Sequence, residues 1–122
     1  MSFHHHTVSI KYAWEGVVHG LKTQPNFRIH LILSLVAIIA SYYFQISNFK
    51  FLIILLLVGL GLAIEYLNTA IEYTVDLMTD KHHLLAKHAK DCAAAGMLIF
   101  SVFTILISAI IFLPEIILWL SI

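Results

Sequence analysis

Charged side chains are scarce in this sequence. Only 11% of its 122 residues are charged while 61% are hydrophobic, and seven basic side chains balance seven acidic ones. A chain without net charge lacks the basic surface that a phosphate backbone requires, so nucleic acid is excluded as a partner. A composition this apolar departs from the average of soluble proteins in the direction of membrane proteins.

Cysteine and proline are also rare. The single cysteine, Cys92, excludes an internal disulfide framework. We expect Pro25 to end an N-terminal helix and Pro114 to end the last apolar segment, because proline cannot continue the helical hydrogen-bond ladder. The first residues, MSFHHHTVSIKYAWEG, lack the apolar core and small-residue site of a cleavable signal. We therefore expect one domain, residues 1–122, whose membrane segments belong to the folded protein and not to a cleaved signal.

Three apolar segments predict an all-α integral membrane protein. We expect spans at about residues 27–46, 49–76 and 91–113. The second reaches spanning length only if its helix continues through EYLNTAIEY, which places several acids near one membrane face. Lysines and an arginine before the first span and lysines between the second and third predict that these parts are cytoplasmic.

A further helix is expected ahead of the spans, at about residues 8–23. Its apolar side chains recur at helical spacing on one side, and lysines, Glu15 and His19 fall on the other. Such a pattern, with Trp14 on the apolar side, is typical of a helix that lies in the plane of the lipid headgroups. The alternative is a helix packed against its own protein.

The second span carries a polar stripe. At about 100° per residue, one narrow face holds Glu65, Asn68, Glu72 and Asp76. Each acid costs about 3 kcal/mol near the centre of a bilayer if it is unpaired. The stripe is either the solvated cytoplasmic end of a long helix or a functional site within the membrane. The first interpretation explains Asp76 well and Glu65 poorly, because Glu65 lies deeper.

The oxygens of this stripe suggest phosphoryl transfer. Carboxylates and amides bind Mg²⁺, which shares its coordination shell with substrate phosphates. A cation for the phosphates follows at the mouth of the third span, in AKDCAAAG, where Lys90 and Asp91 precede small residues that allow close helix packing. Metal, cation and base are the components that phosphoryl transfer requires.

These residues resemble a known family. The patterns E-x-L-N-T-A-I-E-x-x-V-D-L and A-K-x-A-K-D-x-A-A-A, with YAWEG and NFRIHL upstream, are similar to the prokaryotic diacylglycerol kinases and particularly their undecaprenol kinase branch. The resemblance implies a homotrimer of three-span subunits with a surface helix, in the bacterial plasma membrane. It implies transfer of the γ-phosphate of ATP, with Mg²⁺, to the hydroxyl of undecaprenol or diacylglycerol at the cytoplasmic face.

The resemblance also implies roles for individual residues. Glu65 matches the catalytic base, which contacts the lipid hydroxyl, and Glu72 matches a metal-binding glutamate. The positions that match contacts to ATP are Tyr12, Asn68, Glu72, Asp76, His83, Lys90 and Asp91. Trp14 and Ala94 match positions that line the lipid substrate.

Three positions depart from the family pattern. The second metal-binding glutamate is replaced by Gln24, whose amide oxygen can bind Mg²⁺ but supplies no charge. An arginine near the amino terminus is replaced by His5, and an acid in the cytoplasmic connection by Lys81. An alternative function is therefore a non-catalytic relative that binds nucleotide or lipid, weakened by Gln24 and His5. A carrier of divalent cations, using the acids and histidines, is a second alternative.

Overall fold

Residues 3–121, the part of the chain whose backbone is described, fold into four helices. The structure, a computed structural model, describes the backbone of residues 3–121 and the side chains of residues 9–121. In chain order the helices are α1 (Phe3–Thr23), α2 (Pro25–Tyr43), α3 (Asn48–Met78) and α4 (Leu84–Leu120). The all-helical class predicted from the sequence is confirmed. The side chain of His5 lies outside the described residues.

The breaks that follow α1 and α2 have local causes. Pro25 stands in the first turn of α2, where a backbone N–H would have no hydrogen-bond partner within the helix, so the lack of an N–H in proline costs nothing there. Gln24 before it has an extended backbone, with φ −109° and ψ 105°. This pair ends α1 and allows the chain to change direction. Between α2 and α3, Gln45 has a positive φ of 49°, the left-handed conformation that closes a short turn.

The two long helices each begin at a side-chain cap. The hydroxyl of Ser47 accepts a hydrogen bond from the backbone N–H of Lys50, at 3.4 Å, at the start of α3. At the start of α4, Nδ1 of His83 accepts one from the N–H of Leu85, at 3.2 Å. Caps of this kind satisfy N–H groups that have no partner within the helix. His83 therefore sets the first turn of α4.

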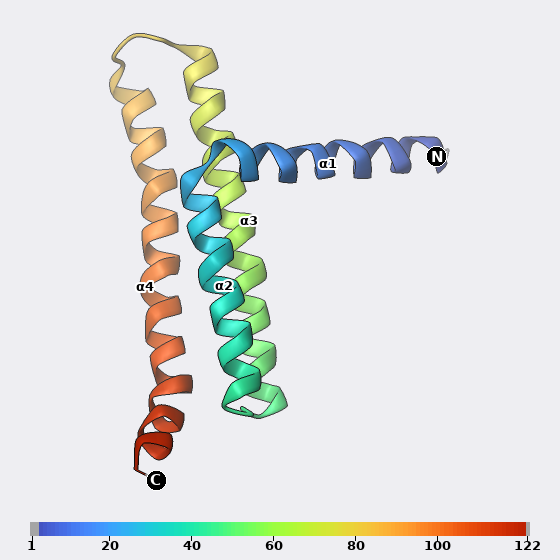
Figure 1. The fold of residues 1–122 in the computed structure, drawn as a ribbon. Coiled ribbons are helices and arrows are strands. Elements are labelled where there is room, and N and C mark those ends of the chain that lie inside the picture. The colour runs from blue at the N-terminus through green and yellow to red at the C-terminus, as the bar shows by residue number, and fades with distance from the viewer. Residues whose placement is uncertain (1–2, 122) are drawn as a thin grey trace.

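Helix α3 lies in the middle of the molecule. It packs against α2 on one side and α4 on the other, while α1 contacts the bundle near the start of α2. Figure 1 shows α2, α3 and α4 running side by side, and α1 leaving them almost at a right angle. The α3–α4 connection extends beyond the level of α1, on the opposite end from the α2–α3 turn (Figure 1). The polar connection and α1 are thus at the same half of the molecule.

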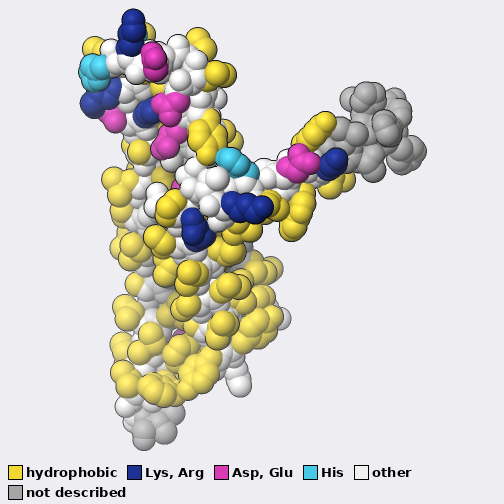
Figure 2. Space-filling model, turned by 45° about the horizontal axis from the view of Figure 1, so that its top comes forward, with side chains coloured by type: hydrophobic (Ala, Val, Ile, Leu, Met, Phe, Trp, Pro, Cys, Tyr) yellow, Lys and Arg dark blue, Asp and Glu magenta, His cyan; other side chains and the backbone are white. Residues whose placement is uncertain are grey.

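Most apolar side chains are on the outside. Among the described residues, the buried hydrophobic side chains are only Phe27, Ile54 and Ile111. Three helices, α2, α3 and α4, are long and apolar enough to cross a membrane. On the face drawn in Figure 2, charged and histidine side chains collect along α1 and at the α3–α4 end, and the shaft below is covered by hydrophobic side chains. This distribution is that of a membrane protein.

The helix ends differ from the expected ranges. Helix α1 begins before residue 8, and α2 occupies Pro25–Tyr43 rather than 27–46. The largest difference is in α4, which begins at Leu84 rather than near 91 and continues past Pro114 to Leu120. The prediction that Pro114 ends the helix is therefore wrong. A proline removes one backbone hydrogen bond but does not force a helix to end, and α4 continues through the short segment from Glu115 to Leu120.

Candidate active site

The polar stripe of α3 faces the interior of the bundle at its deep end. Glu65 is 4% exposed and Thr69, one turn further, 8% exposed. Asn68 and Glu72 are half-buried, while Asp76 is exposed. The stripe therefore runs from a buried carboxylate to a solvated one. A buried carboxylate is costly unless it is used or paired, and the solvated end of a helix does not account for Glu65.

Asn68 and Glu72 are joined by a hydrogen bond. The side-chain Nδ2 of Asn68 donates to Oε1 of Glu72 at 3.3 Å, across one helical turn. The other end of the amide, Oδ1 of Asn68, is buried and has no hydrogen-bond donor among the described residues. A buried carbonyl oxygen without a donor, beside a carboxylate, is a suitable oxygen ligand for Mg²⁺.

A cleft opens where α3 passes into α4. It has a volume of about 570 Å³ and is lined by Val75, Asp76, Thr79, Asp80, Lys81, His82, His83, Ala86, Lys87, Lys90 and Asp91. Four of the residues expected to bind ATP are in this set: Asp76, His83, Lys90 and Asp91. The cleft thus brings together two helices and the turn between them, and its polar walls suit a charged, water-soluble ligand.

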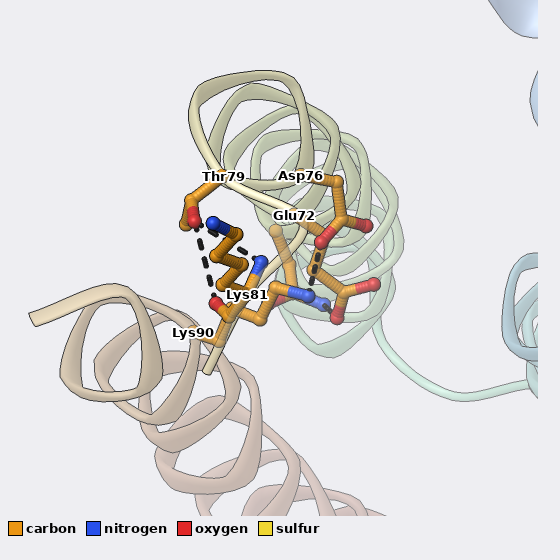
Figure 3. A network of polar contacts seen from close by, with 6 residues as sticks. Glu72, Asp76, Thr79, Lys81 and Lys90 are labelled. Carbon is orange, nitrogen blue, oxygen red and sulfur yellow. Dashed lines mark hydrogen bonds and ion pairs between the residues drawn. The ribbon is translucent and has the colours of Figure 1, made fainter. Parts of the chain in front are cut away.

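The lysines of the cleft are held by acids. Figure 3 shows Lys90 reaching from α4 to α3, where its ammonium group forms an ion pair with Asp76. Lys87 forms a second ion pair with Asp91, one turn along α4. Each lysine keeps further donors, because an ammonium group carries three N–H bonds. Phosphate oxygens that entered the cleft could therefore bind these lysines without displacing every acid.

The α1 residues expected at the site stand apart from the cleft. Tyr12 and Trp14 are 63% and 65% exposed, on the helix that leaves the bundle (Figure 1). Ala94 is exposed on α4 and is not among the residues that line the cleft. Within a single chain the cleft therefore brings Asp76 of α3 together with His83, Lys90 and Asp91. Asn68 and Glu72, further along α3, and the α1 residues are not among the residues that line it.

Gln24 is held by α3 in a way that the sequence did not predict. Its Nε2 donates to the hydroxyl of Tyr73 at 2.9 Å, and Nε2 of His19 lies 3.0 Å from the same hydroxyl. Within the described residues, no group of three or more histidine, cysteine or acidic side chains could hold a metal ion. The contact to Tyr73 uses the nitrogen of the Gln24 amide and not its oxygen, so the pairing of Gln24 with Glu72 around a metal, which the resemblance implies, stays a prediction.

Several residues of this region were not singled out from the sequence. Tyr66 donates through its hydroxyl to the carbonyl oxygen of Val17 at 2.7 Å, and its ring lies 4.7 Å from that of Phe27. Thr79 shapes the α3–α4 turn, because its hydroxyl accepts from the N–H of Lys81 at 3.2 Å. Helical spacing placed the tyrosines off the stripe, and nothing in the sequence indicated their partners on α1.

Comparison with known proteins identifies close relatives. The family model described as "Prokaryotic diacylglycerol kinase" matches residues 11–112. The chain is 42% identical over 107 residues to the undecaprenol kinase of Bacillus subtilis (strain 168), covering 88% of this chain and 87% of the relative. It is 37% identical to the diacylglycerol kinase of a Synechocystis strain, covering 88% of this chain and 62% of the relative. It is 28% identical to the diacylglycerol kinase of Escherichia coli (strain K12), over 72% of each chain.

Proposed function

The chain belongs to the prokaryotic diacylglycerol kinase family and is a lipid kinase, and we propose that it transfers the γ-phosphate of ATP to undecaprenol or diacylglycerol at the cytoplasmic face of the bacterial membrane. The greater identity to an undecaprenol kinase favours undecaprenol as the acceptor. The observation that carries the proposal is a buried carboxylate, Glu65, on the same helix face as Asn68, Glu72 and Asp76.

Glu65 is the proposed catalytic base. Burial within an apolar bundle excludes bulk water from its carboxylate, which is the setting in which a base acts on the hydroxyl of a lipid substrate. It takes the hydroxyl proton while the hydroxyl oxygen forms a bond to the γ-phosphorus. The bond between that phosphorus and the bridging oxygen of ADP breaks at the same time. The products are the lipid phosphate and ADP, and the proton remains on Glu65 until it is released to water.

The α3–α4 cleft is the proposed site of the nucleotide. Lys90 and Lys87 supply positive charge for the phosphates, and Asp76 and Asp91 hold the two ammonium groups in position. His83 caps α4 through Nδ1, so its Nε2 is left to face a ligand in the cleft. Fixed donors at the place where charge develops lower the barrier without reorganisation during the reaction.

Glu72 and Asn68 are the proposed Mg²⁺ ligands. The buried Oδ1 of Asn68, which has no donor among the described residues, and the adjoining carboxylate fit a hard cation. Bound Mg²⁺ would neutralise charge on the β- and γ-phosphates of ATP. The bond from Asn68 Nδ2 to Glu72 fixes the direction of the carboxylate.

We also propose that the enzyme works as a homotrimer whose sites lie between neighbouring subunits, with α1 on the membrane surface. The exposure of Tyr12 and Trp14 supports this arrangement, because α1 presents them away from its own bundle. A neighbouring subunit would then receive the nucleotide contact of Tyr12 and the lipid contact of Trp14. A bundle of three helices also leaves part of the surface of α3 uncovered, and further copies of the chain can cover it.

The test is phosphoryl transfer from γ-labelled ATP to each lipid at several Mg²⁺ concentrations. We expect labelled lipid phosphate from at least one acceptor, and Glu65→Gln should lower kcat by about 10²–10⁴-fold, the contribution of a general base. The glutamine keeps the shape and removes the base. Retention of lipid-dependent ATP consumption by Glu65→Gln would show that another group accepts the proton.

The alternative function is a non-catalytic relative that binds nucleotide or lipid. The replacement of the family's metal-binding glutamate by Gln24 is the observation that favours it. Gln24→Glu discriminates between the two. A large gain in rate would show that the native chain is impaired, whereas little change would show that Gln24 is compatible with turnover.

A further inference from the structure

The hydroxyl of Tyr73 joins three parts of the chain. Tyr73 lies on α3, His19 on α1 and Gln24 in the link between α1 and α2. Nε2 of His19 and Nε2 of Gln24 lie 3.0 Å and 2.9 Å from this one oxygen. The rings of His19 and Tyr73 also meet edge to face, with centroids 5.8 Å apart. We call this group of three side chains the Tyr73 junction.

Each member of the Tyr73 junction has a distinct hydrogen-bonding role. The amide nitrogen of Gln24 is a donor only, so the tyrosine oxygen accepts from it. The one hydrogen of the hydroxyl is then free to point at Nε2 of His19, which accepts it when the imidazole is neutral and protonated on Nδ1. Phenylalanine at position 73 would keep the ring contact and lose both bonds.

A second tyrosine attaches α1 to α3 on the same side. The hydroxyl of Tyr66 donates to the carbonyl oxygen of Val17 at 2.7 Å. Gly20 permits this approach, because a Cβ at that position would lie 2.5 Å from the same hydroxyl oxygen. Tyr66 and Tyr73 are seven residues apart, about two helical turns, and so lie on one face of α3. The two tyrosines hold α1 at two points along that face.

The direction of α1 depends on these contacts. Helix α1 has few other neighbours, since it leaves the bundle at once (Figure 1). It carries Tyr12 and Trp14, the proposed contacts to ATP and lipid, and the next residue before Tyr73 on α3 is Glu72. A change at the Tyr73 junction would therefore move the α1 ligand contacts relative to the acids of α3, whether those acids belong to the same chain or to a neighbour.

We propose that Tyr73 is a positioning residue for the kinase reaction. In this proposal Gln24 acts through its hydrogen bond to Tyr73, which holds α1 against α3, and does not act as a ligand of the metal. This inference rests on the proposed function for its effect on activity. Its geometric part, that the Tyr73 junction holds α1, is independent of that function.

The first test is Tyr73→Phe in the full-length protein, reconstituted in lipid. Loss of two hydrogen bonds should raise KM for ATP and for the lipid acceptor by about three- to tenfold, with kcat within about twofold of the native value. The matched control is Tyr42→Phe, the same chemical change at an exposed tyrosine near the opposite end of the bundle. It should leave both parameters unchanged. A fall in kcat without a rise in KM would contradict a positioning role.

The second test is a double-mutant cycle with Gln24→Leu. If Gln24 acts through Tyr73, its effect on KM should be absent in a Tyr73→Phe background, and the half-saturating Mg²⁺ concentration should not change in either background. If Gln24 is a metal ligand, Gln24→Leu should raise half-saturating Mg²⁺ equally with and without the tyrosine hydroxyl. That result would overturn the proposal.

A third measurement does not depend on activity. The chain has two tryptophans, so Trp119→Phe leaves Trp14 on α1 as the only fluorescent indole. In that background, Tyr73→Phe and Gln24→Leu should each lower the fluorescence anisotropy of Trp14, because α1 becomes more mobile, while Tyr42→Phe should not.

If the native chain fails to phosphorylate any lipid yet the anisotropy falls, the proposed function is wrong and the Tyr73 junction stands. Unchanged anisotropy and unchanged KM in Tyr73→Phe together refute the Tyr73 junction.

Discussion

Glu65 and Asp76 lie on one face of one helix but in opposite surroundings. Glu65 is buried within the bundle, whereas the Asp76 side chain is 61% exposed and paired with Lys90. An exposed ion pair contributes about 0–1 kcal/mol to stability. A buried carboxylate lowers stability unless its charge is compensated. Stability therefore accounts for neither residue, whereas the proposed kinase chemistry gives each of them a role.

Lys90 provides a prediction at the residue scale. Lys90→Met removes a charge from the proposed nucleotide cleft, and we expect KM for ATP to rise about tenfold or more, with thermal stability changed by less than about 1 kcal/mol. Lys90→Arg keeps the charge and should restore part of the affinity. Lys22→Met, an exposed lysine outside the cleft, is the control. ATP titrations of the initial rate provide the measurement, and an unchanged KM in Lys90→Met would remove this lysine from the nucleotide site.

Asn68 provides a second prediction. Asn68→Leu removes the donor to Glu72 and the buried Oδ1, so we expect the half-saturating Mg²⁺ concentration to rise about 10- to 100-fold. Thr74→Val is the comparison, because the Thr74 hydroxyl bonds only to the backbone of its own helix, at the carbonyl of Ala70. Rates measured across a Mg²⁺ series would decide the matter. Equal Mg²⁺ dependence in Asn68→Leu and the native protein would argue that the oxygen serves another purpose.

At the scale of elements, the long α4 serves both ends of the molecule. Its first turns carry the cationic wall of the cleft, and its continuation beyond Pro114 carries Glu115, whose Oε1 lies 2.9 Å from Nζ of Lys50 at the start of α3. The two side chains are 24% and 36% exposed. This ion pair ties α3 and α4 together at the end farthest from the proposed site (Figure 1).

The Lys50–Glu115 pair predicts an effect on stability rather than on catalysis. Lys50→Met leaves a half-buried carboxylate without its partner, and we expect a loss of about 1–3 kcal/mol. The double variant Lys50→Met/Glu115→Leu should recover most of that loss, since it removes both charges. Thermal unfolding in detergent measures the first effect, and the kcat of the folded fraction should not change. A large fall in kcat at full folding would indicate that the far end is coupled to the site.

At the scale of the whole molecule, one chain does not complete the proposed site. Apolar residues cover its outside, α3 is flanked on two sides only, and α1 presents its expected ligand contacts away from the bundle. Lipid can cover the apolar surface, but it cannot bring Tyr12 to a nucleotide in the α3–α4 cleft. A neighbouring copy of the chain can, and the proposed homotrimer supplies one.

Subunit mixing tests this arrangement. Glu65→Gln is defective on α3 and Tyr12→Ala on α1, so each should be inactive or weak alone. If a site combines α3 of one subunit with α1 of another, co-assembled mixtures should regain activity well above either parent, because some sites then contain two native parts. Mixtures of separately assembled trimers are the control and should show no gain. Absence of gain after co-assembly would place each site within one chain.

The sequence by itself determined the class of fold and the polar stripe. Hydropathy and length are local properties, so they predicted the three long apolar helices, and the helical period of α3 predicted which acids share a face. The motifs likewise predicted the family, which the comparisons confirmed. Helix ends were less accurate, since a proline removes one backbone hydrogen bond but does not by itself decide whether a helix ends, and α4 continues past Pro114 to Leu120.

Only the tertiary structure decided which side chains meet. Gln24 and Tyr73 are 49 residues apart, and nothing in the sequence indicated that the nitrogen of the Gln24 amide would meet the hydroxyl of Tyr73. Lys90 and Asp76 likewise meet only because α4 turns back along α3. The physical reason is that helix formation depends on near neighbours along the chain, whereas these contacts depend on the angle at which whole helices pack.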